Sequence, residues 1–137
     1  MKLSEVIAKY SSQDEFISVL KSEVIKLGTE NSDFIYNPGF IGSCSYSGPA
    51  YRFEFDDELC DYVQIVVGPE CKGCIFGQAM QNMGWDNEEE MPYFGSISTV
   101  LLNHGFHDKE IRVFQEVQSN QDSGASWGEA IKQLLEV

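Results

Sequence analysis

The sequence predicts an α+β fold: a mainly helical single domain of about five helices, with one central antiparallel β-hairpin, spanning residues 1–137. Apolar residues recur at three- and four-residue spacing over most of the chain, which is the pattern of amphipathic helices. A shorter middle segment alternates apolar and polar residues, as strands do. The length of 137 residues and the apolar fraction of 42% suit one folded unit.

The first predicted helix begins at Ser12. Ser12-Gln-Asp-Glu15 forms a capping box, in which the serine accepts from an otherwise unpaired backbone N–H and the glutamate reaches back. Apolar residues follow at helical spacing as far as Leu27, and Gly28 is expected to end the helix in the left-handed conformation. The Asn-, Ser-, Gly- and Pro-rich segment Thr29 to Gly48 predicts an irregular loop pinned by aromatic side chains.

The hairpin is predicted from the next two segments. Tyr51-Arg-Phe-Glu-Phe55 alternates apolar and polar residues, and Tyr62-Val-Gln-Ile-Val-Val67 has the composition of a returning strand. The acidic stretch Asp56-Asp57-Glu58 supplies the turn between them.

The second half of the chain predicts four more helices. Their apolar residues recur at helical spacing, and Gly84 and Gly105 mark the ends of the first two. Ser126-Trp-Gly-Glu129 is a second capping box and opens the last helix. The four helices are expected to start near Ile75, Ile97, Asp108 and Ser126.

The charge of the chain points to its partners. The formal net charge is −13, and twelve acidic residues lie between Leu27 and Asp108 against only Arg52 and Lys72. Such a chain repels nucleic-acid phosphates and anionic lipid and attracts basic protein surfaces. We therefore expect a basic protein partner, no direct nucleic-acid partner and no membrane partner. No apolar run has the length of a signal peptide or a membrane span, so we expect a cytoplasmic protein. Cysteines in that compartment are mostly unpaired, and we expect the same here.

Two acidic clusters are the candidate partner-binding residues, together with nearby aromatics. Carboxylate pairs can also act in acid–base catalysis or bind cations, but a solvated turn lacks the fixed, partly buried geometry this requires. Trp85 and Tyr93 are equally compatible with recognition and with pinning a loop to the core, whereas Trp127 is expected in the core. The candidate set is Glu54, Asp56, Asp57, Glu58, Asp61, Trp85, Asp86, Glu88, Glu89, Glu90 and Tyr93.

The cysteines suggest an alternative to partner binding, namely a reactive thiol or a metal site. Cys71-x-x-Cys74 lies at a predicted helix start, where the helix dipole favours a thiolate, but the chain lacks the βαβ context of thioredoxin-like sites and Glu70 opposes the thiolate. A zinc site is a second possibility, although only one pair is closely spaced and Gly105 interrupts the histidine pair. Its ligands would come from Cys44, Cys60, Cys71, Cys74, His104 and His107. We expect no cofactor.

The second half of the chain resembles a group of small uncharacterised proteins common in bacteriophages and actinobacterial genomes. The resemblance rests on Cys74-Ile-Phe-Gly-Gln78, on Val100-Leu-Leu-Asn-His-Gly105 and on the element Gln121-Asp-Ser-Gly-Ala-Ser-Trp-Gly-Glu-Ala130. It implies a shared helical scaffold and a mobile-element setting, and it implies no reaction. Within it, the helix at Cys74 and the turn at Trp127 are expected to form one packed unit, in which Gln78 and Asp122, if buried, are satisfied by capping the turn from Ser123 to Gly128.

The function that the sequence favours is a non-enzymatic acidic binding module, a phage- or prophage-type accessory or inhibitory protein that docks on a basic protein surface. The alternative is a Cys74-dependent enzyme, or a redox or metal site that uses Cys71 and Cys74.

Overall fold

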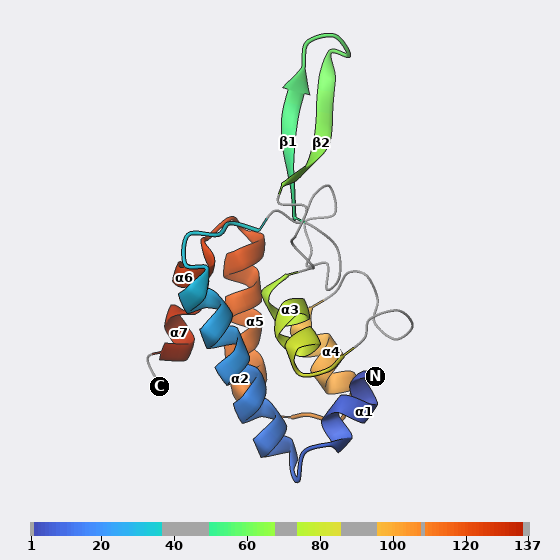
Figure 1. Cartoon of the computed structure of the whole chain (residues 1–137), viewed down its shortest axis with the longest axis vertical. Helices are drawn as coiled ribbons and strands as arrows, with labels where there is room; N and C mark the ends of the chain where they lie inside the picture. Colours follow the sequence, from blue (N-terminus) through green and yellow to red (C-terminus); the bar gives the residue numbers. More distant parts are fainter. Residues whose placement is uncertain (1, 37–49, 68–73, 86–95, 108, 136–137) are drawn as a thin grey trace.

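A computed structural model describes residues 2–36, 50–67, 74–85, 96–107 and 109–135. Over these residues the fold class is confirmed as α+β, with seven helices and one two-stranded antiparallel sheet. The helices pack into a body from which the hairpin projects along the long axis of the molecule (Figure 1). The hairpin is therefore central in the chain but peripheral in the fold.

The elements follow one another in the order α1, α2, β1, β2 and α3 to α7. Their bounds are α1 Leu3–Ala8, α2 Gln13–Glu30, β1 Ala50–Asp56, β2 Asp61–Val67, α3 Ile75–Asn82, α4 Ile97–Asn103, α5 Lys109–Asp122, α6 Trp127–Ala130 and α7 Lys132–Leu135. The sequence did not predict α1, which has six residues and buries only Leu3 and Val6. The single C-terminal helix expected after Ser126 is divided into α6 and α7.

Helix α2 begins where the sequence predicts but ends later. The Ser12 side chain accepts from the Glu15 backbone N–H at 3.1 Å, while the Glu15 carboxylate bonds to Ser11. The expectation that Gly28 ends the helix is wrong: α2 continues to Glu30 and is capped by Asn31. Gly28 does not adopt the left-handed conformation, and its lack of a side chain instead makes room for Ile131, which lies between α6 and α7.

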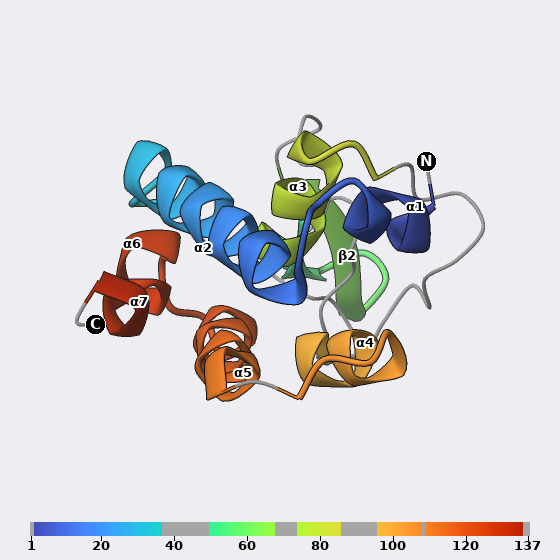
Figure 2. The ribbon, with the colours of Figure 1, turned by 90° about the horizontal axis from the view of Figure 1, so that it is seen from below.

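The helices surround a shared core. Helix α2 contacts α3 on one side and α6 on the other, while α5 contacts α4 and α6, an arrangement that is clear from below (Figure 2). The Phe76 and Phe114 rings meet at 5.4 Å between α3 and α5. Trp127 is 2% exposed, as predicted, and packs edge-on against Phe34 at 4.6 Å.

Glutamines of α5 cap the starts of two other helices. The Gln118 Oε1 atom accepts from the Ile97 backbone N–H at 2.6 Å, at the first turn of α4. The Gln121 Oε1 atom accepts from the Ile75 N–H at 2.8 Å and from the Trp127 indole N–H at 3.0 Å. The Cys74 helix and the Trp127 turn thus pack together as predicted, but the described link is Gln121, while Gln78 and Asp122 are half-buried.

Candidate interaction site

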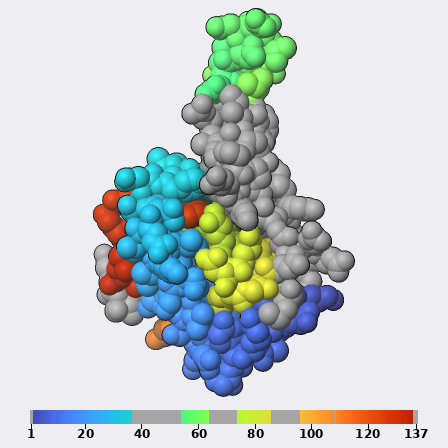
Figure 3. All heavy atoms as spheres, viewed as in Figure 1, coloured from blue at the N-terminus to red at the C-terminus, as the bar shows by residue number. Residues whose placement is uncertain are grey.

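The predicted hairpin is confirmed and forms a projection from the molecule. Strands β1 and β2 pair in a continuous antiparallel register from Ala50 opposite Val67 to Asp56 opposite Asp61. The end of the hairpin stands clear of the helical body (Figure 3). A partner could therefore approach the end of the hairpin from several directions.

Acidic side chains give the turn its negative charge and also form hydrogen bonds that fix its conformation. The Asp56 Oδ1 atom accepts from the backbone N–H groups of Glu58, at 2.9 Å, and Leu59, at 3.2 Å, which closes a local turn. Cys60 then adopts φ = 51°, a left-handed conformation uncommon for a residue other than glycine. The Asp61 carboxylate accepts from the Tyr62 N–H at 2.8 Å as β2 begins.

Apolar side chains at the end of the hairpin are exposed, and the sequence analysis did not single them out. Phe55 and Tyr62 lie opposite each other in the register, with ring centroids 5.4 Å apart and an interplanar angle of 71°. They are 54% and 62% exposed, and Leu59 in the turn is 66% exposed. We call these three residues the apolar tip. The signal that could have found it is an apolar residue, Leu59, inside an acidic turn.

Five carboxylates lie at the same end of the hairpin as the apolar tip. Because side chains alternate along a strand, Glu54, Asp56 and Asp61 lie on the face opposite the Phe55–Tyr62 pair. Asp57 and Glu58 lie in the turn and are exposed. The prediction that these five acidic residues lie on the hairpin is correct, and the end of the hairpin has an aromatic face, an acidic face and an acidic turn between the strands.

The aromatic part of the predicted partner surface requires a correction. Trp85 is 3% exposed and belongs to the core, so it does not lie on the surface where the sequence analysis placed it. It follows Gly84, whose φ of 106° turns the chain back after α3, and its backbone N–H donates to the Met80 carbonyl at 3.0 Å. The remaining candidates, Asp86, Glu88, Glu89, Glu90 and Tyr93, lie outside the described residues.

The cysteines are placed differently from the expectation of unpaired thiols. Cys74 is the N-cap of α3, is fully buried and is disulfide-bonded, with its partner outside the described residues. Cys60 is an exposed free thiol in the hairpin turn. Cys44 and Cys71 lie outside the described part of the chain.

The described residues offer no metal site. No group of three or more His, Cys, Asp or Glu side chains among them is placed to hold an ion. His104 caps the end of α4 and Gly105 follows with φ = 87°, so the predicted break between the two histidines is confirmed. Nor does any helix within the described ranges have the length and apolar character needed to cross a bilayer.

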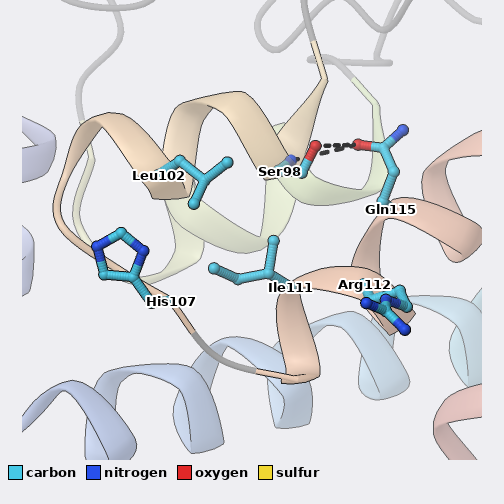
Figure 4. A pocket seen from close by; sticks show the side chains of 6 residues that line it. All are labelled: Ser98, Leu102, His107, Ile111, Arg112 and Gln115. Atoms are coloured by element: carbon cyan, nitrogen blue, oxygen red, sulfur yellow. Dashed lines mark hydrogen bonds between the residues drawn. The ribbon is translucent and has the colours of Figure 1, made fainter.

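A shallow groove between α4 and α5 was not predicted. It has a volume of about 460 Å³ and joins apolar, cationic and amide side chains (Figure 4). At one end the Gln115 Oε1 atom accepts from the Ser98 N–H at 3.2 Å and from the Ser98 hydroxyl at 3.0 Å. The lining residues are Ser98, Leu102, His107, Ile111, Arg112 and Gln115.

Comparisons with known proteins add no assignment. No family model matches this chain, and neither the curated proteins nor the solved structures that were compared with it include a match. The likeness to phage-type proteins therefore stays a prediction from the sequence.

Proposed function

We propose that the protein is a non-enzymatic binding module whose hairpin docks on a basic protein surface. The observation that carries the proposal is the apolar tip, Phe55, Leu59 and Tyr62, exposed at the end of a projecting hairpin and bordered by carboxylates. Protein interfaces commonly combine an apolar, aromatic centre with a polar rim. The carboxylates of the turn and of the opposite face would steer a basic partner and set its orientation.

The charge of these acids, as distinct from their hydrogen bonds in the turn, favours binding rather than stability. Asp56 and Asp61 are directly opposite in the register, and like charges in this position destabilise a hairpin. No Lys or Arg occurs between Arg52 and Lys72 to offset them. These charges oppose folding of the free hairpin but attract an approaching cation. This combination is expected of a docking surface.

The setting of this activity is proposed from the sequence resemblance alone. A phage- or prophage-type accessory or inhibitory protein would use such a hairpin to occupy a basic surface of another protein. The described geometry does not support Cys74 as a nucleophile or a metal ligand, because its side chain is buried and its sulfur lies in a disulfide.

The experiment compares capture by the whole chain and by two variants of equal charge. Asp57→Asn with Glu58→Gln removes two negative charges from the hairpin turn, and Glu30→Gln with Asp33→Asn makes the same change at exposed positions at and just after the end of α2. Proteins retained from native cells are quantified between about 50 and 500 mM NaCl, a range over which screening becomes strong.

We expect a basic protein retained by the wild type and the control, bound at least about tenfold more weakly by the hairpin variant, and released as salt rises. The captured protein is then purified and titrated against all three chains. Equal retention by all three, or binding unaffected by salt, contradicts the proposal.

A further inference from the structure

The edges of the hairpin are open to a further strand. In the described part of the chain β1 and β2 form a sheet of only two strands, so each strand has one paired edge and one outer edge. The backbone groups of an outer edge can pair with another extended segment, and a two-stranded hairpin is stabilised by a third strand. The end of the hairpin stands clear of the helical body, where a segment of another protein can reach it (Figure 3).

The two faces of the hairpin end differ in chemistry. Phe55 and Tyr62 lie opposite each other on one face, with their rings in contact and more than half exposed. Three of the four described side chains on the other face are carboxylates. The residues of this acidic face are Glu54, Asp56, Asp61 and Val63.

These faces determine the sequence that a third strand needs. Side chains alternate between the two faces of a sheet, so an added strand continues both faces at once. Every second residue of the added strand would lie on the side of Phe55 and Tyr62, where an apolar side chain covers exposed ring surface. The residues between them would lie on the side of Asp56 and Asp61, where Lys or Arg forms ion pairs. The complementary segment therefore alternates apolar and basic residues.

The acidic face also disfavours other strands. Exposed edge strands tend to pair with copies of themselves, and charged side chains suppress this pairing. Asp56 and Asp61 already oppose each other in the hairpin, and a second copy would bring the same carboxylates beside them. Within the described chain each of the two uses one oxygen in bonds to nearby backbone N–H groups, which leaves the other oxygen for a cation. The edge thus rejects a second copy and accepts a basic strand.

We propose that the end of the hairpin binds an extended segment of a basic protein, in which apolar residues alternate with Lys or Arg, as a third strand of its sheet. The inference rests on the proposed function of the hairpin and names the kind of segment that it binds. Main-chain hydrogen bonds supply affinity in this mode of recognition, and the alternating side chains supply specificity. A basic helix of the same composition does not fit, because its backbone N–H groups are already paired within the helix.

The test titrates the isotope-labelled whole chain with three peptides of about nine residues, long enough to lie along either seven-residue strand. The first peptide alternates Lys with Val and Tyr. The second has the same sequence with N-methyl groups on its central amides, which removes main-chain donors but keeps every charge and side chain. The third has the same composition with its Lys residues grouped at one end. Amide chemical shifts locate the binding and measure its affinity.

We expect the alternating peptide to bind with a dissociation constant below about 1 mM at about 50 mM NaCl. The N-methylated and grouped peptides should bind at least about tenfold more weakly. Amides from 54 to 63 should shift, and those of α5 should not.

Two variants of equal charge test the acidic face. Asp61→Asn keeps an acceptor oxygen for the Tyr62 N–H but removes a charge from this face, so it should weaken binding of the alternating peptide about threefold. Asp33→Asn, at an exposed position after α2, should leave binding unchanged. Circular dichroism verifies that both variants are folded.

Strand addition is overturned if the alternating peptide does not bind, if either of the other peptides binds equally well, or if Asp61→Asn has no larger effect than Asp33→Asn. The proposed function is judged separately. A basic protein that native cells supply, and that the chain loses when Asp57 and Glu58 are neutralised, would still support docking of the hairpin through its side chains.

Discussion

Gln121 shows how one buried side chain can fix several elements. It is fully buried, its oxygen serves both the start of α3 and the Trp127 indole, and its amide nitrogen donates to the Asp122 carboxylate at 3.0 Å. The first N–H groups of a helix have no partner within the helix, so a buried helix start needs an acceptor from elsewhere. Gln121 supplies this acceptor from α5.

Replacing Gln121 by Met should therefore destabilise the protein by about 2–4 kcal/mol, because two buried donors lose their acceptor while the side-chain volume is nearly kept. Urea unfolding followed by circular dichroism measures the loss. The control is Gln115→Met, whose oxygen bonds to Ser98 at a half-buried position where water can substitute. We expect the control to lose less than about 1 kcal/mol. Equal losses would show that the burial of the two N–H groups that donate to Gln121 does not determine the loss of stability.

The reason for a glycine at position 28 lies outside α2, in the packing of Ile131 against it. A Cβ atom at this position would lie 2.6 Å from Ile131 Cγ2, 2.7 Å from its Cδ1 and 2.9 Å from its Cγ1. These are far shorter than van der Waals contacts, and the γ atoms of a branched side chain cannot turn away together.

We predict that Gly28→Ala destabilises the protein by about 1–2 kcal/mol, although helix propensity alone would favour Ala by up to about 1 kcal/mol. Ser22→Ala, at an exposed position of the same helix, should instead be neutral or slightly stabilising. Thermal and urea unfolding measure both. The double variant Gly28→Ala with Ile131→Ala should lose less than the sum of the single losses, and strict additivity would exclude the proposed clash.

The same residues show what sequence can predict at this scale. Ser12 and Ser126 were correctly identified as N-caps, because a cap acts on N–H groups two or three residues away. Gly28 was misassigned and Gln121 was not given its role, because Ile131 and Ile75 are their decisive neighbours and lie far along the chain. Local chemistry is readable from sequence, whereas the residues through which distant segments meet are not, as Gln121 and Ile131 show.

At the scale of elements, the hairpin differs from the helices in what stabilises it. A two-stranded hairpin is marginally stable in water unless another strand or a helix covers one face. In the described residues its strands pair only with each other, and no helix lies along its outer end (Figure 1). The Phe55–Tyr62 contact is then one of the few side-chain interactions that hold its end together.

We expect hydrogen exchange to resolve this difference. Backbone amides of β2 should exchange through local opening, at a free energy several kcal/mol below that of α2 and α5. Phe55→Ser should accelerate exchange in the hairpin by about threefold, since it removes a cross-strand contact of roughly 0.5–1 kcal/mol. Exchange in α5 should not change.

Leu59→Ser is the matched control, because Leu59 is equally exposed in the turn and has no ring partner. Mass spectrometry of peptides from the hairpin and from α5 makes the comparison. Uniform protection of the hairpin and the helices would contradict this view of the hairpin and indicate that one cooperative unit includes both.

The sequence predicted most elements because their periodicity is a local property. The strands β1 and β2 and the helices α2 to α5 were found within a few residues of their bounds. Helix α1 escaped because six residues contain too few apolar positions to define a period. The exposure of the apolar tip escaped because alternation in a strand identifies two faces but not which of them another element covers.

For the whole molecule, net charge opposes folding and favours a basic partner. A formal charge of −13 on 137 residues stores repulsion in the compact state. The described ion pair between Glu129 and Lys132, at 2.9 Å, is 61% exposed on both sides and compensates little. Screening by salt should then weaken the repulsion between like charges more than it weakens the attraction between opposite charges.

The predicted consequence is that salt stabilises the free protein while it weakens binding. Between about 10 and 200 mM NaCl we expect the unfolding temperature to rise by several degrees, since about 1 kcal/mol corresponds to roughly 4 °C for a chain of this size. Lys26→Glu, which makes the net charge more negative, should lower the unfolding temperature at low salt and approach the wild type at high salt. Capture of a basic partner should decline over the same range. An unfolding temperature that falls with salt would mean that attractive ion pairs outweigh the net repulsion. In that case salt would weaken binding by unfolding the protein and not by screening the charges of the hairpin.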